Sequence, residues 1–194
     1  MPDDTNPPAL VTLTRRLEGA RPLDVISGAV QPVVDALLAD PKRADALHGM
    51  WVGHSIHPML TDVPIGVWTS ATILDFVGGK KSRKASQRLI AIGVLAWVPT
   101  AVTGWSEWGP LPKREQRVGL VHAVSNASAL VLYANSWRAR RRGSHAKGVL
   151  LGLAGSAALQ LGGYLGGHLV ETRKVASAHP AYAEVPAQQP VTVS

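Results

Sequence analysis

Four long apolar segments constrain what this chain of 194 residues can fold into. They run approximately over residues 58–77, 88–105, 118–137 and 148–170. A hydrocarbon core about 30 Å thick needs about 20 apolar helical residues, and about 17 suffice. Apart from Arg88 at a boundary, the only charged residues within the segments are Asp62 and Asp75. The sequence therefore predicts an all-α integral membrane protein with a four-helix bundle over residues 51–172, rather than a soluble bundle of buried helices.

Positive charge gathers in two loops between these segments. Residues 78–88 and 138–147 each hold five Lys or Arg and no acidic residue, whereas the region before the first segment has five basic and seven acidic residues. Short loops rich in Lys and Arg stay on the cytoplasmic side. The net charge of +7 therefore indicates topology, with both termini outside, and we expect no nucleic-acid partner. Asp75 is predicted to pair with Lys80 or Lys81 of the first loop.

The regions on either side of the predicted bundle carry weaker signals. Residues 1–20 contain Asn6-Pro7-Pro8 and are predicted to be a flexible tail without a signal peptide. Residues 21–50 place apolar side chains at helical spacing, which predicts amphipathic helices on the outer face of the membrane. Residues 173–194 are rich in Ala and Pro and are predicted to be a disordered tail.

Small residues and prolines predict how the helices pack. Glycines four residues apart let helices approach closely in lipid, and such a face can also mediate dimerisation. Pro64 and Pro99 each free a carbonyl four residues earlier, which packed surroundings must satisfy. Three GxxxG spacings occur in the last apolar segment: Gly148 with Gly152, Gly162 with Gly166, and Gly163 with Gly167.

Catalytic motifs are not found in the sequence. The chain has no cysteine, which excludes thiolate metal sites, covalently attached haem and iron–sulfur ligation by this chain alone. The serines have no nucleophile-elbow context, and there is no glycine-rich phosphate loop or zinc-protease helix. We therefore expect no catalytic residues and no independent enzymatic activity.

Three histidines fall near the same predicted membrane face. His57, His122 and His168 each lie close to the outer end of a different apolar segment. Polar groups are costly in hydrocarbon and usually face the bundle interior, so polar stripes below the histidines are predicted to face one another. The stripes consist of Asn126 and Tyr133 on the third segment, and Ser156, Gln160 and Tyr164 on the fourth.

Three kinds of ligand suit such a cluster. Two facing histidines can ligate a b-type haem, histidines with a carboxylate can bind a transition metal, and histidine beside carboxylate, tyrosine and tryptophan can bind a quinone. The candidate cofactor-binding residues are His57, His122, His168, Asn126 and Tyr164. The candidate metal ligands are His57, Asp62, Glu107, His122 and His168.

Several motifs, in order, resemble a known family. They are HPMLTDVPIGVW at residues 57–68, TGWSEW at 103–108, GLVH at 119–122 and GGYLGGHL at 162–169. Over about residues 45–172 the chain is similar to the bacterial membrane family known as domain of unknown function 2231. Relatives in that family carry a Rieske iron–sulfur domain after the position of His168, so the resemblance implies a redox or quinol-linked setting in the bacterial cytoplasmic membrane. After Lys174 this chain has no Cys-x-His motif, and an iron–sulfur partner would be separately encoded.

Three functions remain open from the sequence. The first is a redox-associated membrane subunit that binds haem, a metal or a quinone at the outer face. The second is a non-catalytic membrane scaffold, and the third is a small transporter or proton relay that uses Asp62, Glu107 and the histidines. The expected partners are the lipid bilayer, a separately encoded redox protein and a second copy of the chain.

Overall fold

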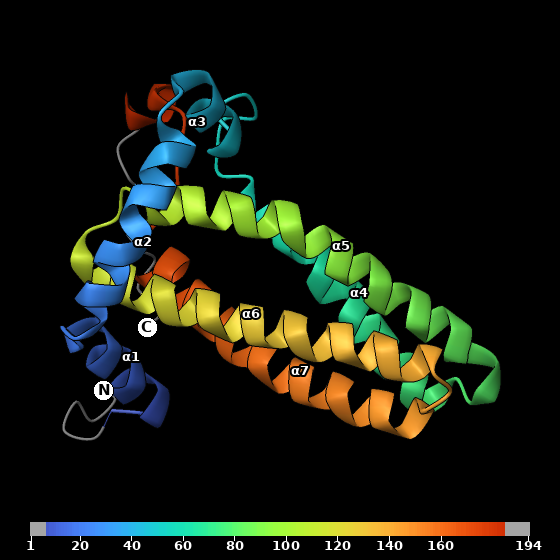
Figure 1. Ribbon diagram of the computed structural model, residues 1–194. Coiled ribbons are helices and arrows are strands. Elements are labelled where there is room, and N and C mark those ends of the chain that lie inside the picture. The colour runs from blue at the N-terminus through green and yellow to red at the C-terminus, as the bar shows by residue number, and fades with distance from the viewer. Residues whose placement is uncertain (1–6, 185–194) are drawn as a thin grey trace, which may run out of the picture.

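A computed structural model of the protein describes residues 7–184, which form helices joined by short turns (Figure 1). Three shorter helices come first: α1 (Ala9–Gly19), α2 (Leu23–Leu38) and α3 (Pro41–Leu47). The long helices are α4 (His57–Val77), α5 (Arg83–Trp108), α6 (Lys113–Arg141) and α7 (His145–Gly167). Single helical turns are η1 (Lys80–Ser82), the π-turn η2 (His168–Thr172) and η3 (Pro180–Glu184). The all-α prediction is confirmed.

The four long helices form two hairpins, α4 with α5 and α6 with α7 (Figure 1). The hairpins meet near their turns and diverge toward the other end, where α2 crosses them. At their junction Trp68 of α4 stacks on Tyr133 of α6, with ring centres 4.1 Å apart. Ile90 packs against this pair and its carbonyl accepts the indole N–H of Trp68 at 3.2 Å. Aromatic packing therefore joins the hairpins at one end and leaves them apart at the other.

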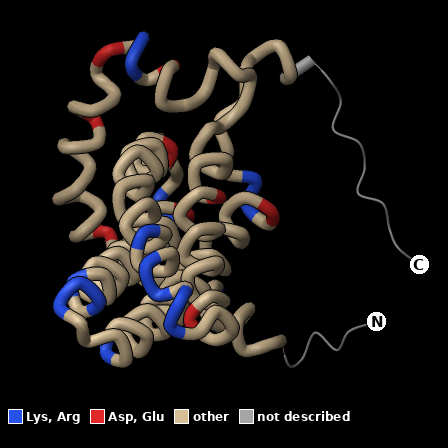
Figure 2. The backbone as a smooth tube through the Cα atoms, turned by 90° about the vertical axis from the view of Figure 1, so that its right-hand side faces the viewer, with Lys and Arg blue, Asp and Glu red and all other residues tan. Residues whose placement is uncertain are grey.

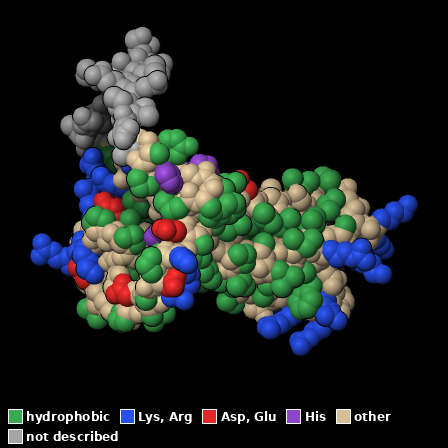
Figure 3. Space-filling view, turned by 90° about the horizontal axis from the view of Figure 1, so that it is seen from above, with side chains coloured by type: hydrophobic (Ala, Val, Ile, Leu, Met, Phe, Trp, Pro, Cys, Tyr) green, Lys and Arg blue, Asp and Glu red, His purple; other side chains and the backbone are tan. Residues whose placement is uncertain are grey.

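Three described helical segments are long and apolar enough to cross a membrane: Lys80–Trp108, Lys113–Arg141 and His145–Thr172. Helix α4 has 21 residues but is not among them. Figure 3 shows apolar side chains along the long helices, between an end of mixed charge and an end of Lys and Arg. Exposed apolar surface of this extent is typical of contact with a membrane. Side chains that are more than half exposed include Ile73, Phe76, Leu95 and Leu150.

Glycines let α7 lie close against α6, as the GxxxG spacings predict. A Cβ atom at Gly162 would come within 2.5 Å of the Asn126 side chain, and one at Gly166 within 2.9 Å of His122. These glycines are therefore required for the observed helix separation. The pairs that face α6 are Gly148 with Gly152 and Gly162 with Gly166, whereas Gly163 and Gly167 have no described neighbour within 4 Å of a Cβ position.

The carbonyl that Pro64 leaves free is satisfied from the neighbouring helix. Pro64 lies inside α4 and cannot donate to the carbonyl of Leu60. The hydroxyl of Thr100, on α5, donates to that carbonyl at 3.1 Å. The proline therefore fixes how α4 and α5 pack beside the histidine that begins α4.

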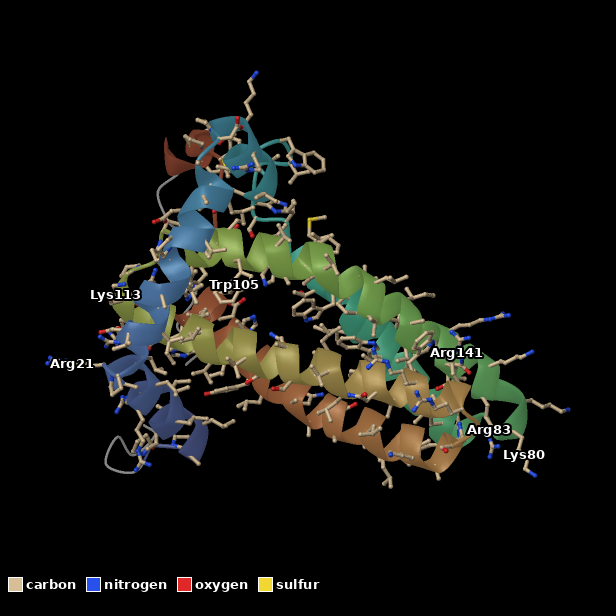
Figure 4. The ribbon with its side chains drawn as sticks, viewed as in Figure 1. Arg21, Lys80, Arg83, Trp105, Lys113 and Arg141 are labelled. Carbon is tan, nitrogen blue, oxygen red and sulfur yellow. The ribbon has the colours of Figure 1, made fainter. Side chains whose placement is uncertain are left out.

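Both basic loops lie at the same end of the long helices, where the hairpins turn. Lys80, Arg83 and Arg141 gather at that end in Figure 4, and Figure 2 shows Lys and Arg on the turns as seen from it. Arg21 and Lys113 lie at the opposite end, near α2.

The predicted pairing of Asp75 with Lys80 or Lys81 is wrong. The Asp75 side chain is 5% exposed, and its carboxylate accepts hydrogen bonds from both terminal nitrogens of Arg140, with Nη1 at 2.7 Å from Oδ1. Asp75 faces inward, toward α5 and α6, whereas the two lysines are exposed on the turn. The partner therefore comes from the second hairpin, 65 residues away.

The N-terminal region differs from the predicted flexible tail. Residues Ala9–Gly19 form α1, and its Glu18 is buried against α6 and His168 of η2. Helices α2 and α3 follow, in the region 21–50 where amphipathic helices are predicted. The rest of the predicted tail, residues 1–6, lies outside the described residues.

The C-terminal segment also differs from the disorder predicted for residues 173–194. The N–H of Ser55 donates to the carbonyl of Ser177 at 2.8 Å, and His54 pairs with Ala178 in an isolated bridge. Residues 173–178 thereby pack beside the loop before α4. Residues 185–194 lie outside the described part of the chain.

Candidate ligand-binding pocket

A cavity of about 410 Å³ lies between the two hairpins, in the half of the long helices nearer α2. Figure 4 shows Trp105 between the hairpins at that end. The walls are mainly apolar and aromatic, with a few polar side chains, which is typical of a small-molecule site. The tryptophans of the lining are Trp68, Trp97, Trp105 and Trp108, and its polar side chains include Ser55, His57, Thr100, Glu107, His122 and Asn126.

Two of the predicted histidines face each other in this cavity. The rings of His57, from α4, and His122, from α6, have centres 6.3 Å apart and planes at 79°. Nδ1 of His57 lies 3.0 Å from the carbonyl oxygen of Thr100, and Nδ1 of His122 lies 2.8 Å from that of Gly162. A carbonyl can only accept, so each Nδ1 carries the proton and each Nε2 keeps its lone pair. A hydrogen bond from one ring nitrogen to a carbonyl is also the arrangement common among metal-ligating histidines.

Two glycines give the imidazoles room. A Cβ atom at Gly104 would come within 2.8 Å of Cε1 of His57, and one at Gly166 within 2.9 Å of Cε1 of His122. Contacts this short displace the neighbour. Gly104 of the TGWSEW motif therefore leaves space for the ring of His57, and Gly166 of the GGYLGGHL motif leaves space for the ring of His122.

Asn126 lies beside the pair, and Tyr164 does not. The amide nitrogen Nδ2 of Asn126 is 3.1 Å from Nε2 of His122, one helical turn away. Tyr164 instead packs against the apolar cluster of Val118, Leu165 and Leu169. The side chain of Tyr164 is not part of the cavity lining.

The third predicted histidine is placed elsewhere. His168 begins the π-turn η2, and its Nε2 lies 2.9 Å from Oε1 of Glu18 in α1. The same carboxylate accepts hydrogen bonds from Arg114 and Arg173. The structure therefore brings His57, His122 and Asn126 together and places His168 in a separate ionic cluster.

A family model described as predicted membrane protein (DUF2231) matches residues 53–179. The chain belongs to this family. The match confirms the resemblance carried by the motifs, and it establishes a membrane protein whose surroundings include the lipid bilayer. No curated protein and no solved structure matches the chain.

In this member of the family, the five predicted metal ligands are not brought together. His57, His122 and Glu107 line the cavity, while Asp62 is exposed on α4 and His168 binds Glu18. Among residues 7–184, no three His, Asp or Glu side chains lie close enough together to bind a metal ion. The cavity thus offers two facing imidazoles rather than a mixed histidine and carboxylate set.

Glu18 is the residue that reasoning from the sequence missed. Burial by itself raises the pKa of Glu18, but hydrogen bonds from Arg173, then His168 and Arg114, lower it to about 2. A neighbouring ion pair joins Arg117 to Asp24 of α2 at 2.7 Å. The available signal was a lone acidic residue in the basic stretch RRLEGAR of residues 15–21.

Proposed function

We propose that this protein is a membrane redox subunit that binds one b-type haem between its hairpins, with His57 and His122 as the axial ligands. The observation that carries the proposal is the separation of 6.3 Å between the two ring centres. Bonds between a metal and histidine nitrogen are about 2 Å long, so an iron between two imidazoles puts their centres roughly 6 Å apart.

The chemistry of the cavity supports the same ligand. Its aromatic and apolar walls suit a flat macrocycle and exclude water. A bound haem supplies one-electron transfer, and the protein sets its potential through ligands, hydrogen bonds and burial. The carbonyls of Thr100 and Gly162 orient the two imidazoles. The Asn126 amide nitrogen, 3.1 Å from Nε2 of His122, must turn away when that nitrogen binds iron. His168 is left out of the ligand set because it lies outside the cavity lining, where Glu18 binds its Nε2.

We further propose a four-span arrangement in a bacterial cytoplasmic membrane. Helix α4 packs against α5 along the first hairpin, so the two helices lie at the same depth in the membrane. The loops at residues 78–88 and 138–147 then lie in the cytoplasm, and both termini lie outside. This arrangement puts the haem pocket in the outer half of the membrane, where a separately encoded redox protein can exchange electrons with it.

The visible spectrum tests the haem proposal. Protein purified in detergent from cells that make haem is expected to show a Soret band and one iron per chain. His57→Ala and His122→Ala are expected to remove or shift that band, because each deletes an axial ligand. His145→Ala, at the basic end, and His168→Ala are expected to keep it. An absent band, or a band unchanged in both ligand variants, would reject the assignment.

A glycine substitution tests how His122 is seated. Gly166→Ala is expected to weaken haem binding roughly 5- to 150-fold, because an overpacked contact costs about 1–3 kcal/mol. Gly152→Ala, on the same helix but outside the cavity lining and with its nearest neighbour 3.6 Å from the Cβ position, is expected to leave binding unchanged. The haem-to-protein ratio after titration measures both. Equal losses in the two variants would attribute the effect to helix stability instead.

A further inference from the structure

Two polar atoms in the cavity are buried without a partner. Among residues 7–184, Oγ of Ser55 and Oε1 of Glu107 have no hydrogen-bond partner, and both residues line the cavity. Ser55 is only 4% exposed. A buried polar atom without a partner costs free energy, so an unpaired hydroxyl and an unpaired carboxylate oxygen on one cavity wall indicate a polar ligand group.

Both residues are held by the C-terminal segment, Glu107 through its side chain and Ser55 through its backbone. The other oxygen of Glu107, Oε2, accepts from the N–H of Ser177 at 3.0 Å and from its hydroxyl at 2.7 Å. The backbone of Ser55 donates to Ser177 as well. Ser177 therefore fixes the polar corner, which we define as Ser55 and Glu107, and leaves one oxygen of each residue free for a ligand.

The surroundings of the polar corner favour an aromatic ligand. Trp105 and Trp108 flank Glu107 in sequence, line the cavity, and have ring centres 5.3 Å apart at 81°. The indole N–H of Trp108 already donates to the carbonyl of Gln116, so this ring offers an apolar surface. Aromatic rings pack well edge to face or offset, and the wall therefore suits a flat ring with a polar substituent.

The position of Glu107 indicates how such a ligand would lie. Glu107 also lines a second, more polar cleft of about 350 Å³, which includes Glu115, Lys174 and Ser177. The carboxylate thus stands between the apolar cavity and a wetter surface. A ring with a hydroxyl substituent fits with its hydroxyl at Glu107 and its flat face beside Trp105 and Trp108, at the edge of the cavity.

We infer that the polar corner binds a hydroxyl group of a hydroquinone. Oε1 of Glu107 is a carboxyl oxygen without a partner and pairs with a ligand group that donates, and Ser55 bonds the same hydroxyl oxygen. The subsite uses neither His57 nor His122 and therefore goes beyond the proposed haem site.

Calorimetric titration of the purified protein in constant detergent tests this subsite. The probes are a short-chain hydroquinone, kept reduced under argon, and its dimethyl ether, which has the same ring without a donor. The hydroquinone is expected to bind one site and the ether at least about tenfold more weakly, because hydrogen bonds to charged groups are the stronger ones. Glu107→Gln and Ser55→Ala are each expected to weaken hydroquinone binding about tenfold.

Glu115→Gln is the matched control, because Glu115 lines only the second cleft. The affinity of this variant for the hydroquinone is expected to equal that of the wild type. Equal affinity for the hydroquinone and its ether, or unaltered binding in both corner variants, would overturn the inference and leave water as the occupant. A Soret band without hydroquinone binding rejects only the subsite. Hydroquinone binding that depends on Glu107, in protein without a Soret band, rejects only the haem.

Discussion

Arg140→Met is expected to lower the free energy of unfolding by about 3–5 kcal/mol, because it leaves the buried carboxylate of Asp75 without its partner. The two side chains are 2% and 5% exposed. Each terminal nitrogen of Arg140 donates to one carboxylate oxygen of Asp75. This bidentate geometry favours the ionised forms of both side chains. Removing one charge from such a pair costs far more than the pair contributes, because the remaining charge stays desolvated.

The Asp75–Arg140 pair also belongs to a hydrogen-bond network that joins all four long helices. Arg140 donates to the hydroxyls of Ser86, on α5, and Ser136, on α6. Ser86 itself donates to Asp75 at 2.8 Å, and Ser136 donates to the carbonyl of Gly148, on α7, at 2.6 Å. Losing Arg140 therefore leaves several buried polar atoms unsatisfied where the hairpins meet.

Thermal or denaturant unfolding in detergent measures the effect, and two comparisons make it specific. The double variant Asp75→Leu with Arg140→Met is expected to be more stable than Arg140→Met alone, because no buried charge remains. Lys80→Ala and Lys81→Ala are expected to change stability by no more than about 0.5 kcal/mol, as exposed positions do. A lysine variant as unstable as Arg140→Met would instead support the pairing that the sequence suggested.

Local patterns predicted much of the fold. Apolar runs located the long helices, and the glycine spacings located two of the contacts between α6 and α7. His57 and His122 were found because each lies near the start of an apolar segment, and α5 runs back between α4 and α6, which brings the starts of those two helices to the same end. These features depend on residues within a few helical turns of one another.

Long-range pairings were not predictable in the same way. The partners of Asp75 and His168 are 65 and 150 residues away, and which helix faces which is not encoded in spacing. Tyr164 shares a helix face with His168, so the prediction placed both toward His122. Instead, Glu18 binds His168 outside the cavity, and Tyr164 packs into an apolar cluster. Glu18 also ties α1 to the rest of the protein, although the sequence predicted a flexible tail there.

Acid is expected to release α1, because the pKa of Glu18 is lowered from 4.5 to about 2 in the folded protein. A carboxyl whose pKa is depressed by folding stabilises the folded state fully above its unfolded pKa. That contribution falls as the pH drops from about 4.5 toward 2, and its full size is about 3 kcal/mol. Glu18→Gln is expected to remove this contribution at pH 7 and to flatten the pH profile below about pH 5.

Hydrogen exchange at pH 7 and pH 3, corrected for intrinsic rates, locates the effect. Glu18 ties α1 to Arg114 of α6 and to Arg173 beyond η2, whereas α6 is also held by its packing against α7. Protection in α1 is therefore expected to fall first, at pH 3 or in Glu18→Gln, while that of α6 persists. Glu171→Gln, an exposed position in η2, is expected to match the wild type. An α1 equally protected at pH 7 in Glu18→Gln would show that apolar contacts alone dock the helix.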